Sequence, residues 1–125
     1  MIVFDTLSYL ESYTGPFPEI NTIISVMDRS LPYDQLPGRY DTPEESSVKY
    51  IIDECLSSEK GFDSPKHEGR RIMEIVLEGE EMVSVSSSVF RLSEGRFLIY
   101  SGDEDVRRGM MYALPVHFKA VRFIF

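Results

Sequence analysis

The longest β-like run in the chain extends from Arg70 to Glu81 and predicts a β-strand closed by a turn. In a strand, successive side chains point to opposite faces of the sheet. One face of this strand is almost wholly apolar and carries Arg71, Met73, Ile75 and Leu77. The other face mixes aliphatic and charged side chains and carries Arg70, Ile72, Glu74 and Val76. We therefore expect any chemistry of this strand to lie on the second, mixed face.

Glu74 lies between two aliphatic residues on the mixed face, where a carboxylate is not expected to be free in water. It lines a cavity, pairs with a neighbour such as Arg70, or lies on a hydrated sheet face, and the pattern leaves these three alternatives open. In a cavity, Glu74 would serve as a general base or a ligand, because buried carboxylates have shifted pKa values and often mark functional sites.

Before this strand, the clearest pattern is helical. Four apolar residues follow the i, i+3, i+4, i+7 spacing of a helix that buries one face. These residues are Ile20, Ile23, Ile24 and Met27. Pro18 fits the first turn of this helix, because its missing N–H has no partner there. A short strand at 2–4 and a shorter helix around Leu7 and Leu10 precede it.

The rest of the chain predicts short strands and turns. Loops are expected at 30–38 and 57–69, where proline and glycine interrupt the pattern. The remaining expected strands are 39–41, 47–56, 82–85, 89–92, 96–100, 110–114 and 116–125. Residues 53–56 could instead be helical. Strands at this spacing with glycine-bearing turns are typical of a sandwich or barrel, so we expect one mainly β domain over residues 1–125.

Thirteen Lys and Arg against 21 Asp and Glu give a net charge of −8. This charge argues against binding to nucleic acid and to anionic membrane surfaces. It does not exclude an anionic small ligand, because the Arg70–Arg71 and Arg107–Arg108 pairs could grip one, or could simply balance nearby acids. With one cysteine, no signal peptide and no long apolar run, the chain is expected to be cytoplasmic. Cys55 is expected to be a small buried hydrophobe.

The chain has no glycine-rich phosphate loop, no nucleophile elbow and no Cys/His zinc spacing. Its imidazoles are His67, just ahead of the 70–81 strand, and His117, just ahead of the last strand. A metal site would need carboxylates such as Glu74 or Asp105 beside an imidazole. The alternative is a pair of histidines without a shared role.

Several motifs, in their order and spacing, resemble the YhcH/YjgK/YiaL family, which includes the β subunit of the evolved β-galactosidase. They are Met1–Leu7, Leu36–Tyr40, His67 followed by the strand into Leu77–Glu81, Gly95–Tyr100 and Lys119–Val121. The most recognisable of them is the histidine shortly before a strand that ends in Leu-Glu-Gly-Glu-Glu. The resemblance covers the chain from end to end, although no single motif is specific.

The resemblance implies a double-stranded β-helix, a cupin-like jelly-roll barrel, with one or two N-terminal helices packed outside. It also implies a role with sugars or sugar acids, such as interconversion of anomers for the members associated with sialic acid. The face that carries Ile72 and Glu74 would line the barrel cavity. A divalent metal, zinc or similar, would lie in the barrel, with His67, Glu74 and Asp105 as its ligands in this chain.

This chain departs from the family pattern at several positions. Pro65 replaces a glutamate two residues before the histidine, and Ile72 replaces an aspartate on the cavity face. Glu74 stands where members carry glutamine or histidine, and Asp105 falls where they have a late histidine. Only His67 is kept, so Glu74 and Asp105 would be substitutes. The segment before the Gly95–Tyr100 motif is also shorter.

Two functional hypotheses follow. In the first, the protein binds a sugar or sugar acid and interconverts its anomers: His67 and Glu74 are catalytic, and Arg70 and Tyr100 bind the substrate. In the second, the protein is an accessory or binding subunit that kept the barrel and lost the chemistry, as Pro65 and the other departures favour. Pairing of two copies into a homodimer through an exposed strand edge is compatible with either hypothesis.

Overall fold

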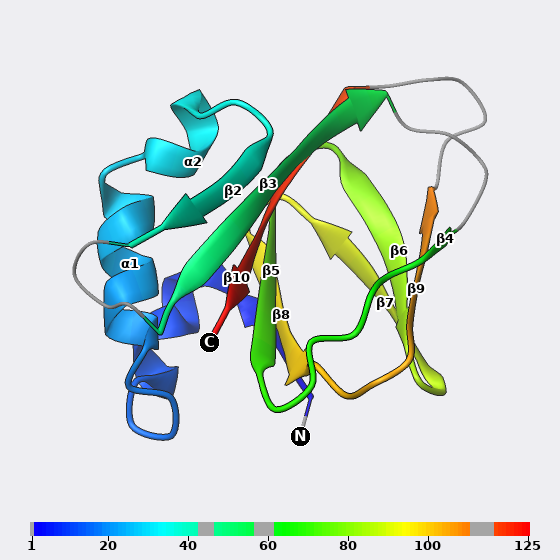
Figure 1. Ribbon diagram of the computed structural model, residues 1–125, viewed down its shortest axis with the longest axis horizontal. Coiled ribbons are helices and arrows are strands. Elements are labelled where there is room, and N and C mark those ends of the chain that lie inside the picture. Colours follow the sequence, from blue (N-terminus) through cyan, green and yellow to red (C-terminus); the bar gives the residue numbers. More distant parts are fainter. Residues whose placement is uncertain (1, 43–46, 57–61, 111–116) are drawn as a thin grey trace.

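The computed structural model describes residues 2–42, 47–56, 62–110 and 117–125, and its strands form two antiparallel sheets (Figure 1). The larger sheet has the order β1 (Val3–Thr6), β8 (Arg96–Ser101), β5 (Arg71–Glu78), β10 (His117–Ile124), β3 (Lys49–Leu56) and β2 (Gly38–Asp41). The smaller sheet has the order β4 (Phe62–Asp63), β9 (Val106–Met110), β6 (Glu80–Val85) and β7 (Ser88–Ser93). The fold is mainly β, as the sequence predicted.

The larger sheet carries a different apolar layer on each face. Its outer face packs against the helices, and the shared cluster includes Met73, Ile75, Phe97, Val121 and Phe123 of the strands with Ile20, Ile23 and Val26 of the helix. Its inner face packs against the smaller sheet, and this second cluster includes Ile72, Val76, Leu98, Val83 and Leu92. The alternation predicted for the 70–81 strand is thereby confirmed, and Glu74 faces inward with Ile72.

The helices all lie on the outer side of the larger sheet (Figure 1). They are the 3₁₀ helix η1 (Leu7–Tyr13) and the α-helices α1 (Ile20–Asp28) and α2 (Leu31–Asp34). The predicted helix over 20–27 is confirmed, but its fully buried stripe includes Val26, whereas Ile24 is only partly buried. The short α2 lies where a loop was expected, because Pro32 fits the first turn of a helix, where no intrahelical N–H is needed.

Other sequence predictions need correction. The 57–69 loop contains the short strand β4, although 57–61 lie outside the described residues. Strand β9 at Val106–Met110 was expected only at Met110, and the rest of the strand expected at 110–114 lies outside the described residues. The alternative at 53–56 is resolved as strand. Cys55 is exposed, not the buried hydrophobe that the sequence predicted, because it shares the accessible face of β3 with Ile51 and the exposed Asp53.

Candidate functional site

A groove of about 410 Å³ lies against the inner face of β2, β3 and β10. Ile51 and Ile124 supply part of its apolar lining. The ionisable residues that line it are Arg39, Asp41, Lys49, His67, Glu68 and Arg70. Arg39, Ile51 and Arg122 are register partners across β2, β3 and β10, so their side chains leave the same face of the sheet. The cationic side chains of the groove thus come from β2, from β3 and from the segment that precedes β5.

The segment that carries His67 and Arg70 is fastened to the turn after β8. The N–H of His67 donates to the carbonyl of Gly102 (2.9 Å), and the N–H of Gly102 donates to the carbonyl of Arg70 (2.7 Å). The N–H of Arg70 in turn donates to the carbonyl of His67 (3.1 Å). A Cβ atom on Gly102 would lie 2.0 Å from the carbonyl oxygen of His67, so the close approach requires glycine.

The electrostatic surroundings keep His67 mainly uncharged at neutral pH. Burial of the ring lowers the pKa of His67 below its ordinary value, and the positive charges of Arg122 and Arg39 lower this pKa further. A neutral imidazole can accept a proton from a ligand. At the groove's outer strands, the Lys49 ammonium lies 3.1 Å from the Asp41 carboxylate. The site therefore combines a neutral base with several fixed charges.

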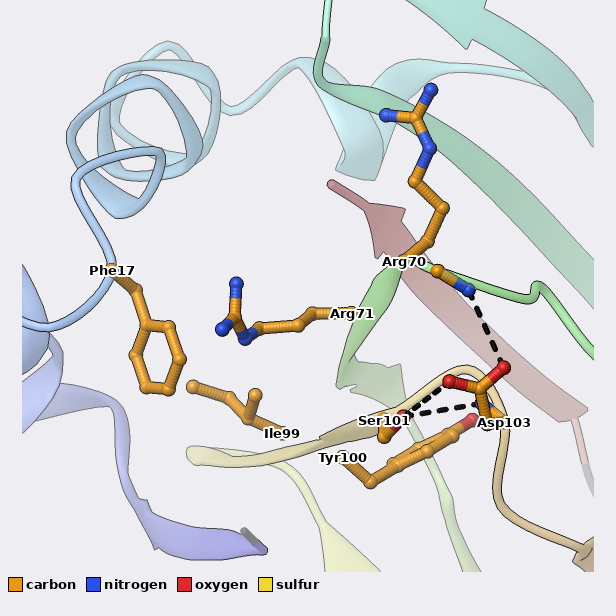
Figure 2. Close-up of a pocket in the computed structure, with 8 residues that line it drawn as sticks. Phe17, Arg70, Arg71, Ile99, Tyr100, Ser101 and Asp103 are labelled. Carbon is orange, nitrogen blue, oxygen red and sulfur yellow. Dashed lines mark hydrogen bonds between the residues drawn. The ribbon is translucent and has the colours of Figure 1, made fainter.

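The side chains of Arg70 and Arg71 point in different directions and contact different residues. Figure 2 shows Arg71 directed toward Phe17, with its guanidinium carbon 5.0 Å from the centre of the phenyl ring. Arg70 runs away from this pair, and its Nη1 donates to the carbonyl of Ser47 over a long 3.4 Å. Because this is a weak hydrogen bond on an exposed side chain, the Arg70 guanidinium remains accessible to an anion in the groove.

Glu74 belongs to a separate cluster that is fully buried between the sheets. Arg108 forms ion pairs with both Glu74 and Glu81, and its Nη1 lies 2.7 Å from Glu81 Oε1. The Tyr100 hydroxyl donates to Glu74 Oε2 (2.7 Å), and Arg108 Nε donates to Ser64 Oγ (2.5 Å). Exposure is 0% for Glu74, 1% for Glu81 and 5% for Arg108. Of the three alternatives for Glu74, the structure shows a buried ion pair, but with Arg108 rather than Arg70.

Burial dominates the protonation of this cluster. It raises the pKa of Glu81 to about 7: Arg108 opposes the shift and Glu74 adds to it. Burial and the Glu74 charge also raise the pKa of Tyr100, so its hydroxyl stays protonated and donates to Glu74.

Glu74 is not among the described residues that line the groove, so the structure does not bring it to His67. Tyr100 lines a different hollow, of about 320 Å³, where Arg70 is also found.

The residues expected to bind a metal do not come together. His67 lines the groove, Glu74 is bound by Arg108 and Tyr100, and the 85% exposed side chain of Asp105 lies 3.0 Å from the Lys66 ammonium. Within the described ranges, no three His, Cys, Asp or Glu side chains are placed to hold a metal ion. These residues therefore do not fit a shared metal site.

Four residues that matter here were not singled out from the sequence: Arg39, Glu81, Arg108 and Arg122. Arg108 was considered only as part of the Arg107–Arg108 pair, and its role is the expected balancing of nearby acids. The signal that could have found it is strand alternation, which places one member of such a pair inside and the other outside. Arg107 is exposed, as this rule requires.

Comparison with known proteins shows the fold and leaves the family open. No family model matches the sequence, and no curated protein matches it. Among solved structures, a cupin protein from Bacteroides fragilis is similar, with a TM-score of 0.56, 12% identity and coverage of 73% of this chain and 76% of that one. The cupin domain of an XRE-family transcriptional regulator from Enterobacter cloacae has a TM-score of 0.53 and 18% identity, covering 70% of this chain and 96% of that one.

A third similar structure is a putative ethanolamine utilization protein Q from Salmonella typhimurium, with a TM-score of 0.52, 13% identity and coverage of 75% and 72% of the two chains. Identities this low establish a shared fold and nothing finer. The fold is a cupin-like, double-stranded β-helix barrel with its N-terminal helices outside, as predicted. No helix among the described residues is long and apolar enough to span a membrane.

Proposed function

We propose that the protein binds a small anionic sugar derivative, a sugar acid, in the groove that contains His67. The observation that carries this proposal is the convergence of Arg39, Arg70 and Lys49 on one concave surface of a protein with a net charge of −8. These three cations outnumber the groove's two carboxylates, Asp41 and Glu68, so the groove carries a local positive excess on an acidic protein, which favours anions. Its volume of about 410 Å³ lies within the range typical of small-molecule sites.

The groove also contains groups suited to the hydroxyls of a sugar. The carboxylates of Asp41 and Glu68 can accept hydrogen bonds from hydroxyls, and the accessible guanidinium of Arg70 can attract the anionic substituent. The resemblance of the sequence motifs to the YhcH/YjgK/YiaL family supports the same ligand class. We therefore also propose that the protein belongs to that family.

The reaction that fits these groups is interconversion of anomers. Neutral His67 would take the proton of the anomeric hydroxyl while the bond between the anomeric carbon and the ring oxygen breaks, and water would deliver a proton to that oxygen. On closure at the other face, the open-chain hydroxyl gives its proton back to the hydroxide left by that water, and His67 returns its proton to the former carbonyl oxygen, which yields the second anomer. Glu74 has no role in this scheme, because Arg108 and Tyr100 already occupy its carboxylate.

A second candidate, binding without catalysis, is favoured by that same engagement of Glu74. A single imidazole without a paired carboxylate can suffice to hold a hydroxyl and still give little rate enhancement. The two candidates share the groove and differ only in turnover. One set of measurements on the same proteins separates them.

The test combines calorimetric titration with NMR measurement of anomer exchange, using glucuronate, N-acetylneuraminate and neutral glucose. We expect wild type to bind a sugar acid and to accelerate exchange. His67→Gln should retain binding and lose about 10²- to 10⁴-fold of the acceleration. His117→Gln is the matched control, because it removes the other imidazole, which is not among the residues that line the groove. Binding without acceleration by wild type would select the second candidate, and no binding to either acid would overturn the proposal.

A further inference from the structure

Arg122 lies beside the groove on the inner face of β10, although it is not among the residues that line the groove. In register, Arg39, Ile51, Arg122 and Glu74 form a row across β2, β3, β10 and β5, all on the inner face. Ile51 lines the groove and Arg122 is the next residue of the row. The Arg122 side chain is only 14% exposed, and its charge acts on His67. Arg122 therefore lies between the groove and the buried cluster.

The guanidinium of Arg122 is only partly satisfied. Its Nη2 lies 2.8 Å from Asp53 Oδ2, whereas its Nε is buried and has no hydrogen-bond acceptor among the described residues. A buried donor on a charged group is costly to leave unpaired, so such a position favours an acceptor supplied from outside the chain. The neighbouring Glu74 does not supply it, because its carboxylate is engaged by Arg108 and Tyr100.

We propose that Arg122 binds the carboxylate of the ligand at the inner end of the groove and thereby selects sugar acids over neutral sugars. This inference rests on the proposed function and names the group that determines its specificity. A guanidinium matches a planar carboxylate with two parallel donors, which a lysine ammonium cannot reproduce. Arg39 and Arg70 then attract the anion at the exposed part of the groove, while Arg122 fixes its orientation beside His67.

The test compares the affinities of glucuronate and glucose, which differ at one carbon that is a carboxylate or a hydroxymethyl group. We expect Arg122→Gln to weaken glucuronate binding by about 10- to 100-fold, the worth of one charge-assisted hydrogen bond or two, and to leave glucose binding unchanged. Arg122→Lys should keep the charge and still lose several-fold in glucuronate affinity, because it lacks the fork. Arg107→Gln is the control, since it removes an equal charge from an exposed position in β9 outside the groove.

The outcomes separate this inference from the proposed function. If wild type and Arg122→Gln bind glucuronate equally, the inference is overturned and the proposed function stands. If wild type binds no sugar acid, the proposed function itself fails. Should Arg122→Gln not fold, Arg122→Lys decides, and wild-type affinity in that variant would overturn the inference. An equal loss in Arg107→Gln would show that total charge, not Arg122, sets the affinity.

Discussion

Two buried carboxylates share one guanidinium between the sheets, because Arg108 forms ion pairs with both Glu74 and Glu81. Removing one partner of a buried ion pair leaves uncompensated charge in a medium that solvates it poorly. Arg108 therefore matters more to stability than an exposed arginine of the same strand. Arg107, its neighbour in β9, points outward and provides the comparison.

We expect Arg108→Ala to lower the free energy of unfolding by about 3–5 kcal/mol at pH 8, which lies above the pKa of about 7 of Glu81. Arg107→Ala should change it by less than about 0.5 kcal/mol, as is usual for exposed positions. Urea denaturation followed by circular dichroism measures both values. Similar losses in the two variants would show that the buried pairs contribute little.

The inward direction of Glu74 could be predicted from the sequence, but the identity of its partner could not. Alternation along one strand decides which face a side chain occupies. The partner comes from β9 in the other sheet, and this pairing depends on how distant strands pack. Pairing with Arg70, one of the three alternatives left open, followed from sequence proximity, which has no bearing on contacts between two sheets.

At the scale of elements, the turn between β8 and β9 holds the segment that carries His67. Two backbone hydrogen bonds join Gly102 to His67 and Arg70, and a third joins Arg70 to His67, all with donor–acceptor distances in the normal range. The sequence placed His67 ahead of a strand but could not indicate this docking, because it depends on backbone groups rather than on a side-chain pattern. Likewise, most of β9 was missed, since its two adjacent arginines and Gly109 hide the alternation typical of a strand.

Gly102→Ala should displace the His67 segment, because the new Cβ would meet the carbonyl oxygen of His67. We expect faster hydrogen exchange at the amides of His67 and Gly102, which NMR can follow residue by residue. Gly109→Ala is the control, since a Cβ at Gly109 meets nothing within 4 Å. Unchanged protection in Gly102→Ala would contradict the docking argument.

At the scale of the whole molecule, the larger sheet separates two kinds of environment. Its outer face holds hydrocarbon against the helices, and its inner face holds hydrocarbon mixed with charge. The alternation along the 70–81 strand predicted this division, because periodicity reports which faces are buried. Strand spacing predicted a sandwich or barrel, and the family resemblance implied the barrel. It did not predict that the barrel interior contains a guanidinium paired with two carboxylates.

The raised pKa of Glu81 makes the stability of the whole fold depend on pH. Its folded pKa of about 7 exceeds the ordinary 4.5, so the fold favours the protonated carboxyl. This contribution is fully present below about pH 4.5 and is lost as pH rises through about 7. Relative to Glu81→Gln, which cannot ionise, wild type should lose up to about 1.4 kcal/mol per pH unit across this window. Urea denaturation at a series of pH values tests this, and parallel curves would refute it.

The carboxylate in the middle of β5 has a consequence for how the sheet assembles. A slip of β5 by one residue against β10 would turn Glu74 outward, into the layer formed by Ile23, Val26 and Phe123. That layer is hydrocarbon, so the misaligned pairing would place the carboxyl group of Glu74 there without a polar partner, at a high energetic cost. The same slip would expose Ile75 to the ionic interior. The buried Glu74 therefore disfavours register-shifted pairings of β5 with β10 during folding.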